Sequence, residues 1–234
     1  MSKSQEYEQP IESQPTEGLA RATIQGPASY DDRLNHILGA ATTLFAEVGY
    51  EKASMRAVAQ AAGISLAGLY HYFASKERIL FLIQYRTFNA LVNNLREKLL
   101  GVEDPVGQLR VMVRTHIGYF AANMAALKVC SHELDSLSGA SYEETFRIRR
   151  DYYELVRAIV NRLFETRAPN GTLDPHVATM SLFGMLNWLY RWYDPACDRS
   201  LTVVANQFAT QFLYGLNGAG AVAPAGRGRE PAAD

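Results

Sequence analysis

The sequence has few cysteines and no apolar segment near its start. Only Cys130 and Cys197 occur among 234 residues, and they are far apart in the chain. This usage argues against a disulfide-stapled secreted fold and predicts a reduced, cytoplasmic setting. Cys130, His132 and Glu133, with His116 upstream, do not have the paired spacing of a zinc site. We therefore predict no metal and no cofactor.

An excess of one charge sign is also absent. Lysine and arginine total 23, aspartate and glutamate total 24, and the pI is near 6.5. This balance excludes a protein coated in positive charge, so DNA binding would depend on a local group of residues. The uncharged run 57–75 approaches membrane-spanning length, but it contains Gln60, His71 and helix-boundary signals. We predict no membrane helix.

Signatures of catalysis and of β-structure are missing as well. No Gly-x-Ser-x-Gly motif occurs, and the serines near His132 do not lie in a strand-turn-helix elbow, so an enzyme is the least favoured function. No strand-like alternation competes with the helical periodicity, while 48% of the residues are hydrophobic. The sequence therefore predicts an all-α protein that is not an enzyme.

Apolar periodicity and capping residues divide the chain into helices. Asp104-Pro105 and Asp174-Pro175 each place a capping carboxylate before a proline at the first helical position. Residues 1–29 and 218–234 are rich in polar residues or in Gly, Ala and Pro, and we predict that both are disordered. The predicted helices are 31–48, 55–62, 66–73, 75–100, 105–124, 126–136, 142–167, 175–193 and 199–216.

The most informative stretch is 54–76, which reads SMRAVAQAAGISLAGLYHYFASK. Ser54 is placed to cap a first short helix, and Gly63 can adopt the left-handed conformation that ends it. Ser65 can cap a second short helix, whose buried face includes Leu69. The outer face then presents small and hydrogen-bonding side chains, which suits entry into a DNA major groove. The stretch predicts a helix-turn-helix.

The surrounding residues carry a family resemblance. The helix-turn-helix ends in Tyr-x-Tyr-Phe-x-Ser-Lys-Glu and follows a helix that ends in LFAEVGY, so the region 31–83 resembles the TetR family of ligand-responsive transcriptional regulators. The resemblance implies a DNA-binding domain at 30–80, a helical effector-binding and dimerisation domain at 81–217, and a repressor released by a small molecule. The predicted DNA contacts are Ser54, Met55, Arg56, Ser65, Leu66, Ala67, Gly68, Tyr70, His71, Tyr72 and Lys76.

One departure from the family pattern concerns the second short helix. The family usually has Gly and then Thr or Ser before the Leu-Tyr pair, whereas this chain has Ala67 and Gly68. A hydroxyl that commonly meets phosphate is therefore missing. The base preference of a relative cannot be transferred to this chain.

The last two predicted helices carry apolar residues at helical spacing. Two such helices from each subunit could pair about a twofold axis as a four-helix bundle. A homodimer of this kind would place two recognition helices on successive turns of a palindromic operator. The predicted dimer contacts are Ala178, Leu182, Met185, Leu186, Leu189, Leu201, Val204, Ala205, Phe208 and Phe212.

A second distinctive segment, 183–193, contains both tryptophans. Together with SHELDSL at 131–137 and the nearby arginines, it resembles TetR-type regulators that respond to acyl-coenzyme A thioesters. An apolar tunnel with arginines at its mouth would suit an acyl chain and a phosphate-rich head. The predicted effector contacts are Met112, His116, Tyr119, Phe120, Phe146, Arg147, Arg149, Arg150, Phe183, Asn187, Trp188 and Arg191.

Several alternatives remain open at the level of sequence. The residues predicted to contact DNA could be a surface patch on a helical bundle. The aromatic residues between 119 and 153 could form a plain core, and Trp188 and Trp192 could anchor the core or the dimer. The chain could also be an architectural DNA-binding protein without a ligand, which would give a footprint that no effector changes.

Overall fold

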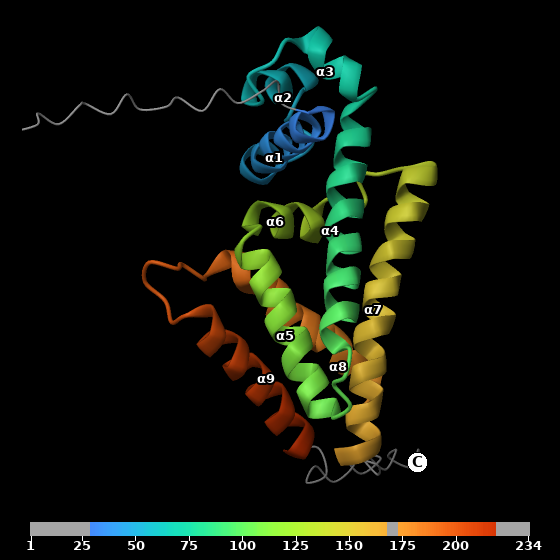
Figure 1. Cartoon of the computed structure of the whole chain (residues 1–234), viewed down its shortest axis with the longest axis vertical. Helices are drawn as coiled ribbons and strands as arrows, with labels where there is room; N and C mark the ends of the chain where they lie inside the picture. The colour runs from blue at the N-terminus through green and yellow to red at the C-terminus, as the bar shows by residue number, and fades with distance from the viewer. Residues whose placement is uncertain (1–28, 168–172, 219–234) are drawn as a thin grey trace, which may run out of the picture.

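The computed structural model describes residues 29–167 and 173–218, and every regular element in these ranges is a helix (Figure 1). This confirms the predicted all-α class. The predicted arm and tail lie outside the described residues, apart from Ser29 and Gly218. In chain order the elements are α1 Tyr30–Val48, α2 Met55–Ala61, α3 Leu66–Tyr72, α4 Lys76–Leu99, α5 Pro105–Ala121, α6 Met124–His132, α7 Gly139–Arg167, α8 Pro175–Asn187, the 3-10 turn η1 Trp188–Arg191, and α9 Leu201–Gly218.

Capping side chains begin the helices at the predicted positions. Ser54 and Ser65 each accept a hydrogen bond from the backbone N–H three residues later, at 3.1 and 3.0 Å. Asp104 and Asp174 cap α5 and α8 in front of their prolines. Gly63 has a φ of +63°, which L side chains rarely adopt, and it turns the chain between α2 and α3. No helix of the described ranges combines the length and the apolarity that crossing a bilayer would need.

Two of the predicted α-helices end earlier than expected. The helix predicted over 126–136 ends at His132, where the carbonyl of Glu133 accepts a hydrogen bond from the Gln84 side chain at 2.9 Å. The helix predicted over 175–193 gives way to η1 at Trp188. There the backbone N–H groups of residues 192 and 193 both donate to the carbonyl of Leu189, which tightens the last turn.

The apolar side chains form two cores, and α4 contributes to both. Its first half, with Ile79 and Leu80, belongs to the first core together with residues of α1, α2 and α3. Its second half, with Leu91 and Leu95, belongs to the second core and packs against α5 and α7. The long helices α4 and α7 run side by side along the molecule (Figure 1). α4 is therefore a continuous rod between the helix-turn-helix and the rest of the chain.

The short helix α6 lies between the two cores. Val129 and the loop residue Leu137 are buried in the first core, whereas Leu127 is buried in the second. α6 packs across α1 as well as against α4 and α5. A displacement of α6 would therefore shift residues in both cores, because close-packed interiors transmit small shifts.

Candidate DNA-contacting surface and effector cavity

The helix-turn-helix projects from one end of the molecule, with α2 and α3 at its outermost point (Figure 1). Its exposed predicted contacts are Ser54, Arg56, Ser65, Ala67, Tyr70 and His71. Met55, Leu66 and Tyr72 are half-buried and pack against the first core, and the ring of Tyr72 also stacks on Tyr30 with centroids 5.0 Å apart. A Cβ added at Gly68 would meet Ser65 Oγ at 3.1 Å, so a larger residue there would crowd the capping hydroxyl.

Lys76, at the start of α4, holds the loop that follows α1. Its Nζ donates to the Tyr50 carbonyl at 2.9 Å and lies 4.0 Å from the centre of the Tyr50 ring. Burial, followed by the charge of Glu77, raises the pKa of Tyr50 to about 12, so its phenol stays protonated. An ammonium group has three donors, and Lys76 therefore keeps capacity for a phosphate.

A cavity of about 500 Å³ lies among α4, α5, α6, α7 and α8. This volume falls within the usual range for small-molecule sites. Buried residues form its floor, and exposed residues such as Phe146, Arg150 and Met180 form its rim. The residues that line it are Phe88, His116, Phe120, Leu127, Cys130, Ser131, Leu134, Phe146, Arg149, Arg150, Tyr152, Tyr153, Glu154, His176, Met180, Phe183 and Asn187.

The floor contains polar groups that are uncharged at neutral pH. His116 Nδ1 lies 3.0 Å from the Tyr152 hydroxyl, and its Nε2 lies 3.2 Å from Asn187 Oδ1. Burial lowers the pKa of His116 to about 4, against the opposing effect of its bond to Asn187. Burial also raises the pKa of the Cys130 thiol to about 11. Neither group carries a charge that could pair with an anion.

Arg149 is a half-buried cation that reaches the cavity wall from α7. Its Nη1 donates to the Cys130 carbonyl at 2.7 Å and to Gln84 Oε1 at 3.3 Å, and its guanidinium lies 4.7 Å from the centre of the Phe88 ring. Burial lowers its pKa from the usual value. Among the described residues no carboxylate forms an ion pair with it. Arg149 is thus a partly buried positive charge held only by neutral acceptors.

Hydrogen bonds continue from Arg149 to the helix-turn-helix unit. Gln84, fully buried on α4, donates to the Glu133 carbonyl at 2.9 Å, and Glu133 Oε1 accepts from the backbone N–H of Tyr50 at 3.3 Å. A second contact joins the same loop to α4, because Ser138 donates to Glu77 through its N–H at 2.8 Å and its hydroxyl at 2.9 Å. The cavity wall and the first core are therefore linked by a continuous polar path.

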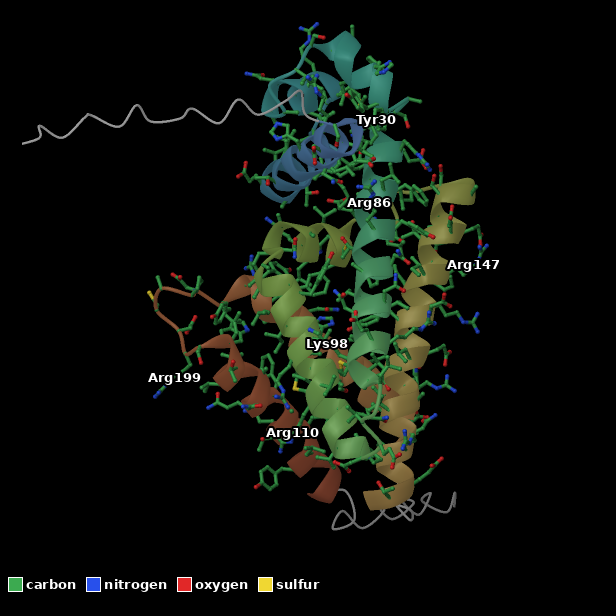
Figure 2. The ribbon with its side chains drawn as sticks, in the orientation of Figure 1. Tyr30, Arg86, Lys98, Arg110, Arg147 and Arg199 are labelled. Atoms are coloured by element: carbon green, nitrogen blue, oxygen red, sulfur yellow. The ribbon has the colours of Figure 1, made fainter. Side chains whose placement is uncertain are left out.

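The predicted effector contacts divide into two groups. His116, Phe120, Phe146, Arg149, Arg150, Phe183 and Asn187 line the cavity. Met112 is fully buried in the second core away from the lining, and Tyr119 is half-buried outside it. Arg147 and Arg191 are exposed beyond the rim, and Figure 2 shows Arg147 pointing away from the helices. Trp188 is 56% exposed on the outer surface, so its prediction as a tunnel residue is corrected.

Sequence reasoning missed other members of the lining. In the sequence, Tyr152 and Tyr153 stand out only as part of an aromatic group that could be core. Phe88, Leu127, Met180 and His176 come from three different helices, and their apolar or amphipathic character is the same as that of core residues. No local signal separates a wall residue from a core residue, since the distinction depends on how the helices cross.

Much of the predicted dimer surface faces inward, which is a further correction. A side chain enclosed by its own subunit cannot make the contact with a second subunit. Periodicity identified an apolar stripe on each helix, but these helices are apolar on more than one face. The residues buried within the single chain are Leu182, Leu186, Leu189, Val204, Ala205 and Phe212. Up to residue 214, where the description of α9 side chains ends, the large exposed apolar residues of α8, η1 and α9 are Val177, Met180, Trp188, Val203 and Tyr214.

A three-helix DNA-binding unit joined by one long helix to a helical bundle with a ligand-sized cavity defines a class of ligand-sensing transcriptional regulators. Two family models match the chain. The model of bacterial regulatory proteins of the tetR family matches residues 37–83, and that of the tetracyclin repressor-like C-terminal domain matches residues 102–216. The chain belongs to the TetR family and is a DNA-binding transcriptional regulator, not an enzyme.

Individual relatives agree with this assignment. PfmR, a TetR family regulator of Thermus thermophilus, is 34% identical, with a TM-score of 0.68 over 76% of this chain and 97% of PfmR. The transcriptional repressor KstR2 of Rhodococcus jostii strain RHA1 is 26% identical over 79% of this chain and 91% of its own. AibR, solved with isovaleryl coenzyme A and operator DNA, shares the fold with a TM-score of 0.69 at 24% identity, over 76% and 97% of the two chains.

Proposed function

We propose that the chain is a dimeric repressor that leaves a palindromic operator when an acyl-CoA thioester enters the cavity. The observation that carries the proposal is the cavity of about 500 Å³, which has aromatic walls and an arginine at its exposed rim. Apolar walls suit an acyl chain, because each buried methylene contributes about 0.8 kcal/mol. The presence of isovaleryl coenzyme A in the AibR structure supports this ligand class for the shared fold.

The head of the thioester would remain outside the cavity, near α7. Arg150 is exposed at the rim, and the exposed Arg147 comes one turn earlier on the same side of the helix. Arginine binds phosphate groups well, because its planar donors match their geometry. This division would leave Arg149 inside the wall, where it meets the part of the effector that enters the cavity.

The exposed face of the helix-turn-helix would contact the operator. The N-terminal end of α3, with Ser65 and Ala67, would lie near base edges, while Tyr70 and His71 would reach the backbone. Arg56 on α2 and the remaining donor of Lys76 would contact phosphates. These side chains are exposed or, for Lys76, half-buried at the free end of the molecule.

Release of DNA requires coupling between the cavity and the first core. An effector oxygen that accepts a hydrogen bond from Arg149 would compete with Gln84 and with the Cys130 carbonyl. Gln84 would then hold the Glu133 carbonyl less firmly, and the loop that contacts Tyr50 would loosen. The resulting tilt of α4 would change the spacing of the two recognition helices. The effector shifts the equilibrium only by its preference for that second conformation.

The dimer would form through the exposed apolar residues of the last helices, not through the buried stripe. Trp188, at 56% exposure, and Tyr214, at 70%, are the largest of these side chains. The double variant Trp188→Asp, Tyr214→Asp should be monomeric in light scattering at micromolar concentration. Leu100→Asp, which changes a 79% exposed side chain at the end of α4, should stay dimeric. A dimer that survives the double substitution would contradict this interface.

The test of function is operator release by acyl-CoAs of increasing length. DNA selected from a random pool on the purified protein supplies the operator, and fluorescence anisotropy follows release. Potency should rise about fourfold per methylene until the cavity is full, and then stop rising. Free coenzyme A and the matching free acids serve as controls. If no thioester releases DNA, the acyl-CoA proposal fails, and a footprint that no effector changes would favour the architectural alternative.

A further inference from the structure

The cavity floor contains a three-residue polar group within a largely apolar lining. His116 is 2% exposed, yet both of its ring nitrogens have polar neighbours, the Tyr152 hydroxyl at 3.0 Å and Asn187 Oδ1 at 3.2 Å. The three residues come from α5, α7 and α8, and all of them line the cavity. The rings of Phe120 and Phe183 flank His116, with centroids 4.9 and 6.0 Å away. The polar group is thus enclosed by apolar surface.

The hydrogen bonds of this group have a defined direction. Asn187 Oδ1 can only accept, so His116 donates from Nε2, and Nδ1 must then accept the Tyr152 O–H. A neutral imidazole has one donor and one acceptor, and both are now used. The Asn187 NH₂ keeps two donors, and no acceptor among the described residues binds them. The Tyr152 oxygen also keeps a free lone pair.

The remaining donors set a requirement on whatever fills the cavity. A saturated hydrocarbon that reached the floor would remove water from the Asn187 NH₂ and give it no acceptor in return, which is unfavourable. A carboxylate would lose its hydration beside a neutral histidine, a neutral tyrosine and an amide. Arg149 is not part of this group, because its hydrogen bonds run to Gln84 and to the Cys130 carbonyl at the cavity wall.

We propose that the effector carries an uncharged oxygen, a ketone or hydroxyl, on the end of its apolar portion that enters the cavity, and that Asn187 donates a hydrogen bond to it. This inference rests on the proposed function for the orientation of the ligand, with the coenzyme A head at the rim. His116 and Tyr152 act as positioning residues, because they hold Asn187 through its Oδ1 at the cavity lining and leave its NH₂ as the group that can donate. The effector class is then an oxo- or hydroxy-acyl thioester in place of a plain fatty acyl thioester.

The experiment compares two thioesters that differ by one oxygen, octanoyl-CoA and 7-oxooctanoyl-CoA. Isothermal titration calorimetry on the purified full-length chain should give at least about tenfold tighter binding of the oxo compound, since one hydrogen bond to a desolvated donor is gained. Asn187→Leu should remove this preference while binding octanoyl-CoA at least as well as the wild type. Asn93→Leu, the same substitution at an exposed position of α4 outside the cavity lining, should keep it. Circular dichroism confirms that each variant is folded.

The possible outcomes separate this inference from the proposed function. Equal binding of the two thioesters by the wild type, or tighter binding of octanoyl-CoA, would overturn it, even if Asn187→Leu does not fold. Binding of neither thioester would overturn the acyl-CoA proposal. In that event, 4-phenyl-2-butanone and butylbenzene provide a pair without coenzyme A. A preference for the ketone that Asn187→Leu removes would support the oxygen requirement, and equal binding would overturn it.

Discussion

Two arginine–glutamine pairs, one in each half of α7, have the same chemistry in different surroundings. Arg149 donates to Gln84, and Gln84 donates to a backbone carbonyl at the end of α6, with distances of 3.3 and 2.9 Å. Arg162 donates to Gln108 at 3.0 Å, and Gln108 donates to the carbonyl of Val102 at 2.7 Å. Both glutamines are buried. Each pair fastens α7 to a neighbouring helix.

The difference lies in what each pair touches next. Arg149 lines the cavity, and the Glu133 residue held by Gln84 continues to Tyr50 in the first core. Arg162 continues only to the carbonyl of Glu103 at 2.7 Å, in the same loop that Gln108 already holds. We infer that the Arg162–Gln108 pair, distal to the helix-turn-helix, serves stability alone. The Arg149–Gln84 pair, which is proximal to it, also couples effector binding to DNA binding. The two pairs differ in role because their neighbours differ, since the hydrogen bonds within each pair are alike.

The largest expected effect is an acid-dependent loss of stability at the cavity end. His116 has a pKa of about 4 when folded and 6.5 when unfolded, so the unfolded chain binds the additional proton as the pH falls below 6.5. Stability is therefore lost between pH 6.5 and 4, by about 3 kcal/mol from this group. Urea unfolding at several pH values measures the loss, and His116→Gln should remove that part of it.

Hydrogen exchange sharpens this prediction within one helix. At pH 5, amides around His116 in the second half of α5 should lose protection before those near Gln108 in its first half. If amide protection is lost uniformly along α5, His116 does not control the local opening of the helix beside the cavity.

The second effect separates coupling from stability. Gln84→Met and Gln108→Met should each lower the free energy of unfolding by about 1–3 kcal/mol, since each strands buried polar partners. Only Gln84→Met should reduce, by at least about tenfold, the weakening of DNA binding that a saturating acyl-CoA causes. Its effector affinity should not fall, because Gln84 does not line the cavity and its removal takes away a competitor for the Arg149 donor. Equal loss of coupling in the two variants would contradict the distinction.

A smaller effect is expected at the carboxylate that reaches the first core. Glu133→Ala removes the acceptor of the Tyr50 N–H, so exchange of that amide should accelerate, and operator affinity without effector should change by about threefold. Glu103→Ala provides the distal control, because only the backbone carbonyl of Glu103 is bonded to Arg162. Exchange measured by NMR at Tyr50 should distinguish the two variants. If the exchange rate of the Tyr50 amide is unchanged in Glu133→Ala, the bond between Glu133 and Tyr50 does not belong to the polar path from Arg149 to the first core.

The smallest effect compares the two ends of α4. Lys76→Ala should weaken DNA binding similarly on all sequences and lower the salt slope by about one unit, as expected for one phosphate contact. Lys98→Ala, near the other end of the same helix, should leave the slope unchanged. If Lys76→Ala lowers stability but not the salt slope, its contact with the Tyr50 carbonyl accounts for the whole role of the residue.

The sequence was most informative where structure depends on neighbours in the chain. Ser54, Ser65, Asp104 and Asp174 cap the helices they were expected to cap, because a cap needs only a side-chain oxygen and a free amide a few residues away. Gly63 ends its turn for a similarly local reason. The helix-turn-helix was recognisable because its spacing of small, apolar and capping residues lies within one short stretch.

Prediction was weaker where a helix has more than one apolar face. Periodicity placed Leu182 and Leu186 on the dimer surface, but α8 buries them in its own subunit, while Val177 and Trp188 are exposed. Periodicity gives the repeat of a stripe and not the identity of the body that covers it. The same limit placed Met112 and Trp188 in the tunnel.

The sequence by itself determined the helices, their caps, the DNA-binding motif and the family. Only the tertiary structure decided which of the predicted effector contacts surround the cavity, which lie outside it, and that Arg149 is bonded to Gln84. Gln84 and Arg149 are 65 residues apart, and Tyr50 and Glu133 are 83 apart, so no local pattern reports their contacts. Such pairs form only when the crossing of several helices is fixed, and that crossing results from the packing of both cores together.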